Sequence, residues 1–168
     1  VRTGRLPRNE GPPIEVALPA LGVMRCGNEQ PGFHTGSGGR QMPSHYSNAD
    51  LHIWSVPTPT GSQLLPACGI AWGIQLDGKR SVVVTTVGDA ATRQGDFYEA
   101  ISFAKEKKLP VLFVVEDNGY GISMPTRRTN PLVLGVLQAS DWQQIEGQDV
   151  GKLYEATRAA MEKIRAGN

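Results

Sequence analysis

The sequence predicts an α/β domain in which helices flank a parallel sheet, and three stretches carry this prediction. Ser81 to Val87 is a short β-branched run that stops at a glycine, as a buried parallel strand does. Asp96 to Lys107 has apolar residues at helical spacing, and Val111 to Val115 is a second apolar strand that directly follows a proline. Strand, helix and strand in this order form one βαβ unit, whose two strands lie side by side and run in the same direction.

Two further helices are expected on either side of this unit. Ser62 to Leu76 is rich in alanine and glycine, which suits a helix packed closely against a neighbour, and Ser62 is a good N-cap residue. Near the end of the chain, helical spacing of mostly apolar residues predicts an amphipathic helix. The residues that mark it are Val150, Leu153, Tyr154, Thr157, Met161 and Ile164.

The first 38 residues differ in character from the rest. Residues 1–38 contain five prolines, many glycines and no sustained periodicity, so an irregular N-terminal segment is expected there. Residues 39–168 are predicted to form the α/β domain.

Composition argues against several classes of protein. The 168 residues are 39% hydrophobic and 20% charged, with a net charge of +1, as in an ordinary soluble domain. This balance predicts neither a nucleic acid nor a membrane surface as partner, and no apolar run approaches the ~20 residues of a transmembrane helix. Cys26 and Cys68 lie in unrelated contexts, which favours a reduced compartment.

The polar side chains that could do chemistry lie in the turns after the two strands. Asp89 follows the first strand and Asn118 follows the second, so both reach the carboxyl edge of the sheet, where open α/β sheets bind ligands. The residues around the aspartate are small and let backbone N–H groups approach an anion: Gly88, Ala90 and Ala91. A carboxylate, an amide oxygen, a backbone carbonyl and phosphate oxygens are the ligands that magnesium takes. The turns therefore predict a magnesium–diphosphate clamp.

The segments V-G-D-A-A-T-R-Q-G and V-V-E-D-N-G-Y-G-I-S resemble the thiamin-diphosphate motif. The resemblance is greatest to α subunits of 2-oxo acid dehydrogenases of the branched-chain or pyruvate type, the decarboxylating first component of those complexes. It implies a thiamin-diphosphate-binding fold, with Asp89, the Asn118 side chain and the Tyr120 carbonyl as magnesium ligands, and with Gly88, Ala90 and Ala91 along the diphosphate. Two residues depart from the family: Ala90 replaces a glycine and Asp117 replaces an asparagine.

A second segment extends the resemblance upstream. G-R-Q-M-P-S-H-Y-S-N, from Gly39, is similar to branched-chain α subunits and implies that His45 lies near the active-site entrance as a candidate catalytic residue; a purely structural role in a buried loop is the alternative. By the same resemblance Thr58 and Thr60 touch the aminopyrimidine ring through backbone groups. Ser62 and Gln63 match two ligand positions of a potassium site, but Pro57 replaces a serine there, which argues against potassium.

The resemblance also implies an activity and partners. The activity is oxidative decarboxylation of a branched-chain 2-oxo acid or pyruvate, with acyl transfer to lipoamide. The partners are a β subunit or β-like domain that completes the site, and a lipoyl-bearing acyltransferase. The family would add a tyrosine–arginine pair before Gly39 and paired histidines after Asn168, so this chain resembles a central fragment that we expect to be inactive alone. Gln144 to Asp149 resembles the family's short strand and turn.

Three other interpretations compete with this one. An NAD-binding domain would place G-x-G-x-x-G after the first strand, and V-G-D-A-A-T lacks it. An α/β domain with an inert acidic turn would explain Gly88-Asp89 taken alone. A truncated or degenerate subunit could serve only as a folding or interaction module. The compartment expected is the cytoplasm of a bacterium, or the mitochondrial matrix in a eukaryote.

Overall fold

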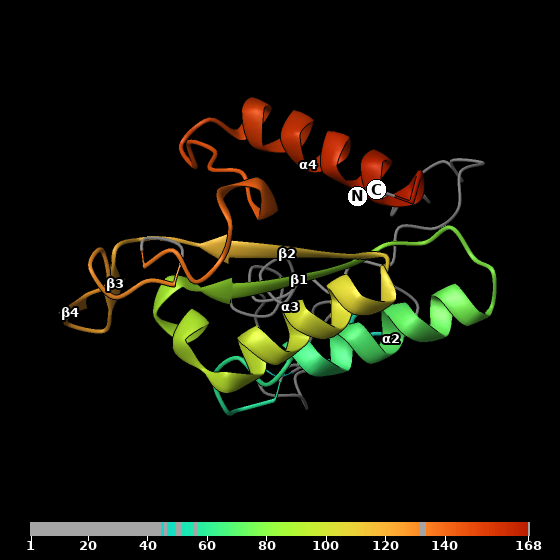
Figure 1. Cartoon of the computed structure of the whole chain (residues 1–168), viewed down its shortest axis with the longest axis horizontal. Helices are drawn as coiled ribbons and strands as arrows, with labels where there is room; N and C mark the ends of the chain where they lie inside the picture. The colour runs from blue at the N-terminus through green and yellow to red at the C-terminus, as the bar shows by residue number, and fades with distance from the viewer. Residues whose placement is uncertain (1–44, 46, 50–51, 56, 132–133, 168) are drawn as a thin grey trace, which may run out of the picture.

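The computed structural model describes residues 45, 47–49, 52–55, 57–131 and 134–167, which form three layers (Figure 1). A two-stranded sheet lies in the middle. Helices α2 (Leu64–Leu76) and α3 (Gly95–Lys107) lie on one side of it, and α4 (Val150–Arg165) lies on the other. The segment 1–38, predicted to be irregular, lies outside the described residues.

The sheet consists of β1 (Val83–Gly88) and β2 (Val111–Glu116), which pair in parallel. Val83 lies opposite Val111 at one end, and Gly88 lies opposite Glu116 at the other. The predicted parallel βαβ unit is confirmed, with boundaries that differ by two residues at most. Because the two strands end level with each other, the turns that follow them start at the same edge of the sheet.

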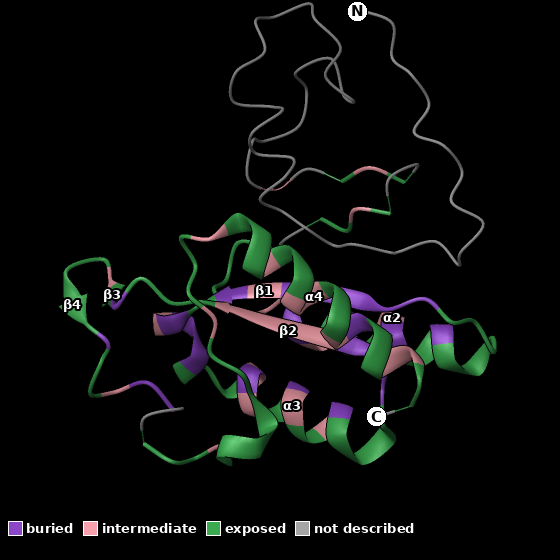
Figure 2. Ribbon diagram, turned by 90° about the horizontal axis from the view of Figure 1, so that it is seen from above, coloured by how far each residue is buried: buried purple, intermediate pink, exposed green. Residues whose placement is uncertain are grey.

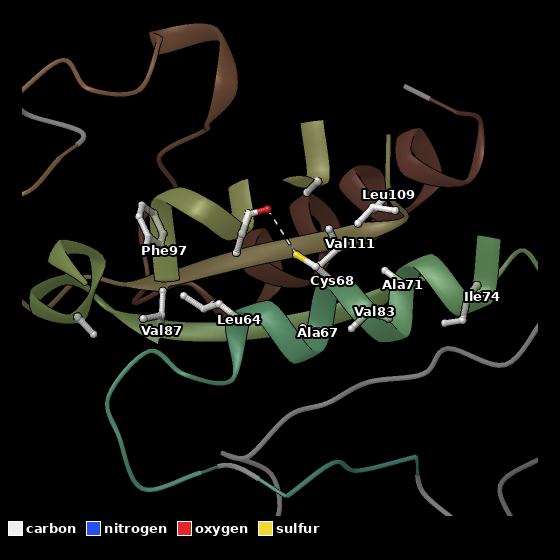
Figure 3. Packing of buried hydrophobic residues seen from close by; sticks show 13 residues of the cluster. Leu64, Ala67, Cys68, Ala71, Ile74, Val83, Val87, Phe97, Leu109 and Val111 are labelled. Atoms are coloured by element: carbon white, nitrogen blue, oxygen red, sulfur yellow. Dashed lines mark hydrogen bonds between the residues drawn. The ribbon is translucent and has the colours of Figure 1, made fainter. Parts of the chain in front are cut away.

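The main core lies between the sheet and the α2–α3 layer. Side chains alternate between the two faces of a strand, so Val83 and Val87 of β1 point to this side together with Val111 of β2. They pack against α2 and α3, as Figure 3 shows, and Figure 2 marks buried stretches of β1 and α2 in purple. The Sγ of Cys68 in α2 donates a hydrogen bond to the Ala100 carbonyl of α3 at 3.4 Å. Burial raises the pKa of this thiol to about 11.

The opposite face of the sheet carries a smaller cluster. Val82, Val84 and Met161 of α4 are buried there, joined by partly buried Leu112, Val114 and Ile164. Asp149 caps the start of α4, because its side chain accepts a hydrogen bond from the Lys152 N–H at 3.0 Å. The predicted amphipathic helix is therefore present. Met161 and Ile164 cover the sheet, whereas Val150 and Tyr154, which the sequence placed on the same side, are exposed.

The connection before α4 contains the short helix η2 (Ala139–Asp141). Lys105 of α3 donates to both carboxylate oxygens of Asp141 at 2.9 Å, which ties this connection to α3. The hydrogen bond from Lys105 lowers the pKa of Asp141. None of the helices in the described ranges is both long and apolar enough to cross a membrane.

Two local predictions were wrong. Ser62 does not cap α2, because its hydroxyl donates to the Pro59 carbonyl at 2.6 Å and the helix begins two residues later, after Gln63. Of the short strand and turn predicted for residues 144–149, only the turn is present, at 147–148, and no described strand runs alongside to supply the pairing that a strand needs.

Candidate functional site

The first turn of the site is the short helix η1 (Asp89–Arg93), which directly follows β1. Its first residue, Asp89, is 2% exposed. The Thr92 hydroxyl donates to the Asp89 carbonyl at 2.5 Å and closes the turn from within. The sequence predicted that the glycine–aspartate pair leads into a helix, and the structure inserts this separate 3₁₀ turn before α3 begins.

The Asp89 carboxylate has an unusual environment for a buried ion. The Thr126 hydroxyl donates a hydrogen bond to its Oδ2 from 37 residues further along the chain. Within the described part of the chain, no lysine, arginine or histidine forms an ion pair with it. A single neutral donor leaves most of the cost of burying the charge uncompensated, and buried carboxylates normally pair with a cation or bind a metal.

The second turn follows β2 and is built by its own side chains. Asp117 Oδ1 accepts a hydrogen bond from the Gly119 N–H, and Asn118 Oδ1 accepts one from the Tyr120 N–H, both at 2.8 Å. These are Asx-type turns, in which a short polar side chain bonds to the backbone two residues ahead. Gly119 has a φ of 78°, a conformation that glycine adopts without steric cost. Asp117 and Asn118 both remain exposed.

A two-stranded hairpin extends from this turn. Strands β3 (Tyr120–Gly121) and β4 (Met124–Pro125) pair antiparallel, with Tyr120 opposite Pro125. The Thr126 N–H donates to the Gly119 carbonyl at 3.0 Å, so the adjoining Tyr120–Pro125 pair is a non-hydrogen-bonded pair. Pro125 has no N–H to offer. The Tyr120 carbonyl is therefore turned away from β4 and is free to act as a ligand.

The hairpin lies directly on η1. A Cβ added at Gly121 would stand only 2.6 Å from the Ala90 Cβ, so the two backbones approach closely because position 121 is glycine. A cavity of about 230 Å³ opens beside this contact. It is lined by Ala90, Arg93, Gly121, Met124, Pro125, Thr126 and Thr129.

The loop before α2 reaches the same place. Gly61, with a φ of 82°, lies against η1: a Cβ there would be 3.5 Å from the Gln94 Cβ and 3.7 Å from the Ala91 carbonyl oxygen. The Gln63 side chain donates to the Thr86 carbonyl of β1 at 2.7 Å and anchors the loop to the sheet. Thr58 and Thr60 are exposed on this loop. The two side chains considered for potassium, Ser62 and Gln63, are thus both engaged in internal hydrogen bonds.

His45 lies in a separate segment. The Ser55 hydroxyl donates to the His45 carbonyl at 2.9 Å, and Asn48 pairs with Ile53 in an isolated antiparallel bridge. These bonds fold residues 45–55 back on themselves where the structure describes them. A role for the His45 side chain at the entrance of the site stays a prediction.

The three predicted metal ligands are all oxygen donors, and that they converge on one ion stays a prediction. The carboxylate of Asp89, the amide oxygen of Asn118 and the outward carbonyl of Tyr120 come from two turns at one edge of the sheet. This donor set suits a hard cation such as Mg²⁺, which takes oxygen ligands and shares its shell with phosphate.

Comparison with known proteins assigns the chain to a family. The profile of the dehydrogenase E1 component matches residues 21–168. The chain belongs to the dehydrogenase E1 component family. This result confirms the family resemblance that the two turn motifs carry.

Three E1 α subunits each match about three quarters of the chain. The chain is 33% identical over 128 residues to the 2-oxoisovalerate dehydrogenase subunit alpha 1, mitochondrial, of Arabidopsis thaliana, covering 74% of this chain and 27% of that protein. It is 33% identical to the 2-oxoisovalerate dehydrogenase subunit alpha of Bacillus subtilis, covering 78% and 41%. It is 34% identical to the pyruvate dehydrogenase E1 component subunit alpha of the same bacterium, covering 77% and 34%. The chain thus spans between about a quarter and two fifths of these relatives.

Two residues of this E1 chain that touch the site were missed in the sequence. Thr126 contacts Asp89 through its hydroxyl. Arg127 lies over the second turn, with its Nε 3.5 Å from the position of a Cβ at Gly119. In the sequence they stand out only as a threonine and the first of two arginines directly after S-M-P. Nothing in the spacing links either residue to Asp89.

Proposed function

We propose that this chain holds thiamin diphosphate through Mg²⁺, as part of the α subunit of a 2-oxo acid dehydrogenase first component. The parent enzyme would decarboxylate a 2-oxo acid oxidatively and transfer the acyl group to lipoamide. The observation that carries the proposal is the Asp89 carboxylate, which is buried at the carboxyl edge of a parallel sheet without a cationic partner in the described chain. A divalent cation at that carboxylate would offset the cost of burying its charge.

The other residues then have defined tasks. Asn118 and Tyr120 would supply the two further oxygen ligands from the second turn. Gly88, Ala90 and Ala91 would let the diphosphate approach the backbone, and the exposed loop with Thr58 and Thr60 would face the aminopyrimidine. Bound thiamin would supply the electron sink for decarboxylation, and the protein would position it. His45 would stand at the entrance.

The substrate class is a 2-oxo acid. Relatives named for 2-oxoisovalerate and for pyruvate match this chain at similar identities, 33% and 34% in the two Bacillus subtilis proteins. That similarity supports the class and favours neither acid.

The proposed partners are a β-type chain and a lipoyl-bearing acyltransferase. The second turn and the hairpin side chains of Tyr120, Ile122 and Met124 are exposed, at 54%, 106% and 70%, which would suit a chain that closes the site from outside. The proposed compartment is the mitochondrial matrix or the bacterial cytoplasm. The Arabidopsis relative is named as mitochondrial, and the Bacillus subtilis relatives are bacterial.

A calorimetric titration with thiamin diphosphate tests the proposal. We expect heat of binding in Mg²⁺ that disappears with a chelator and is absent from Asp89→Ala, which should still fold. The matched control is Asp77→Asn, which alters an exposed carboxylate paired with Lys79 at the far end of β1 and should bind as the wild type does. Binding by Asp89→Ala would refute the clamp.

Absence of binding by the wild-type chain has a different meaning. If a β-type chain then restores Mg²⁺-dependent binding, the proposal holds for the assembled subunits. If it does not, the chain is a non-catalytic folding or interaction module.

A further inference from the structure

Thr126 is the residue that joins the two turns of the site. It follows β4, is 4% exposed, and uses all three of its polar groups in hydrogen bonds. The hydroxyl donates to Asp89 Oδ2, the N–H donates to the Gly119 carbonyl, and the carbonyl accepts from the N–H groups of Thr129 and Asn130 at 2.9 and 3.0 Å.

Two of these bonds, those to Asp89 and to Gly119, bear on the proposed metal ligands. The bond to Oδ2 fixes the rotation of the Asp89 carboxylate and leaves Oδ1 without a hydrogen-bond partner among the described residues. The bond to Gly119 closes the base of the hairpin, between the Asn118 amide and the Tyr120 carbonyl. One side chain and its own backbone therefore hold the supports of all three oxygen ligands in a single geometry.

The chemistry of a hydroxyl suits this task better than that of a cation. A lysine or arginine at this position would neutralise Asp89 and compete with a metal for the carboxylate. A threonine hydroxyl donates one hydrogen bond and adds no charge, so the carboxylate keeps its attraction for a cation. Partners that orient the ligands of a metal in this way contribute strongly to metal affinity.

We propose that Thr126 is the positioning residue of the metal clamp, which aligns Asp89 Oδ1 with the oxygens of the second turn. This inference rests on the proposed function and adds to it a residue that acts through Asp89 and the second turn. Thr126→Val removes the hydroxyl at nearly constant volume and keeps the three backbone hydrogen bonds. The hairpin also keeps its separate contact between Gly121 and Ala90, so the variant is expected to fold.

The experiment compares Mg²⁺ affinity, in the presence of thiamin diphosphate, for the full chain and three variants. Thr126→Val should bind Mg²⁺ about 10- to 100-fold more weakly, the range typical when a partner of a metal ligand is lost. Thr126→Ser restores the hydroxyl and should regain affinity close to that of the wild type. Thr157→Val makes the same change on α4, across the sheet from the site, and should change nothing.

Hydrogen exchange on the metal-free chain provides a second readout. Amides of Tyr120 and Gly121 should exchange faster in Thr126→Val and return to wild-type rates in Thr126→Ser, because the hairpin loses its tie to η1. If Thr126→Val does not fold, Thr126→Ala replaces it in both measurements.

The outcomes separate this inference from the proposed function. Wild-type affinity in Thr126→Val, or weak affinity that serine does not restore, overturns the role of Thr126 and leaves the clamp standing. If the wild-type chain shows no Mg²⁺-dependent binding alone or with a β-type chain, the proposed function fails and takes this inference with it.

Discussion

The two turns that follow β1 and β2 bring polar side chains to the same edge of the sheet, yet different forces hold them. Asp89 in the first turn is buried, and its carboxylate contacts a residue 37 positions away. Asp117 and Asn118 in the second turn are exposed and bond to the backbone two residues ahead. The first turn therefore depends on tertiary packing, whereas the second is set by its local sequence. Changes in the first turn should alter both stability and binding, and changes in the second should alter binding alone.

Removing one proposed ligand from each turn tests this difference between the turns most directly. Asp89→Ala and Asn118→Ala should both abolish or greatly weaken Mg²⁺-dependent binding. Only Asp89→Ala leaves a buried hydroxyl, that of Thr126, without an acceptor, which costs about 1–3 kcal/mol. Asp89→Asn keeps an acceptor there and removes the buried charge, so without metal it should be more stable than Asp89→Ala by about that amount.

Urea unfolding of the three metal-free proteins measures the difference. Asn118→Ala should stay within about 0.5 kcal/mol of the wild type, as exposed substitutions usually do. Equal destabilisation by Asp89→Ala and Asn118→Ala would contradict the distinction between a first turn that depends on tertiary contacts and a second turn set by local hydrogen bonds.

Alkaline pH acts on the core beneath the first turn. Ala91 of η1 packs in the same cluster as Cys68, whose pKa burial raises to about 11. The unfolded chain loses the thiol proton near its ordinary value, so the unfolded state is favoured as pH rises from about 9 to 11. The free energy of unfolding should fall over this window by about 2–3 kcal/mol, at roughly 1.4 kcal/mol per pH unit.

A Cys68→Ser variant isolates that effect. Serine can still donate to the Ala100 carbonyl and does not ionise in this range, so its stability should decline less than that of the wild type. Identical pH profiles for the two proteins would contradict the assignment to Cys68.

The close packing of Gly121 against Ala90 can be tested by adding and removing methyl groups at these two positions. Gly121→Ala places a methyl group 2.6 Å from the Ala90 Cβ, and overpacking of this kind typically costs about 1–3 kcal/mol. Adding Ala90→Gly removes the opposing methyl group and should recover most of the loss. Gly95→Ala meets nothing within 4 Å and serves as the neutral control in the same unfolding measurement. A double variant no more stable than Gly121→Ala would place the clash elsewhere.

The sequence predicted those parts of the molecule that local patterns determine. The β-branched run ending at Gly88 and the apolar run after Pro110 indicated the parallel strands, and the strand ends then brought Asp89 and Asn118 to one edge. The same motifs carried the family resemblance that the comparison confirmed. These features depend on periodicity, turn chemistry and chain order, all of which can be read locally.

The missed features depend on contacts between distant residues. No periodic signal connects Thr126 to Asp89, and the need for glycine at position 121 becomes visible only when η1 lies beside it. Serine is a residue type that often caps helices, but the Ser62 hydroxyl donates its hydrogen bond to the Pro59 carbonyl instead. Where several local partners compete for one polar group, the folded geometry decides between them.

Pro125 has a consequence for the fidelity of folding. The hairpin is short and has a two-residue loop at Ile122 and Ser123, with Ile122 at a φ of 56°. A shift that moved Pro125 into a hydrogen-bonding position would lose one ladder bond, because proline has no donor. The native alignment is the one in which the missing donor costs nothing, and it is also the one that turns the Tyr120 carbonyl outward. Pro125 thus disfavours the shifted register. A residue with an N–H at position 125 would remove this penalty, and the shifted register would point the Tyr120 carbonyl elsewhere.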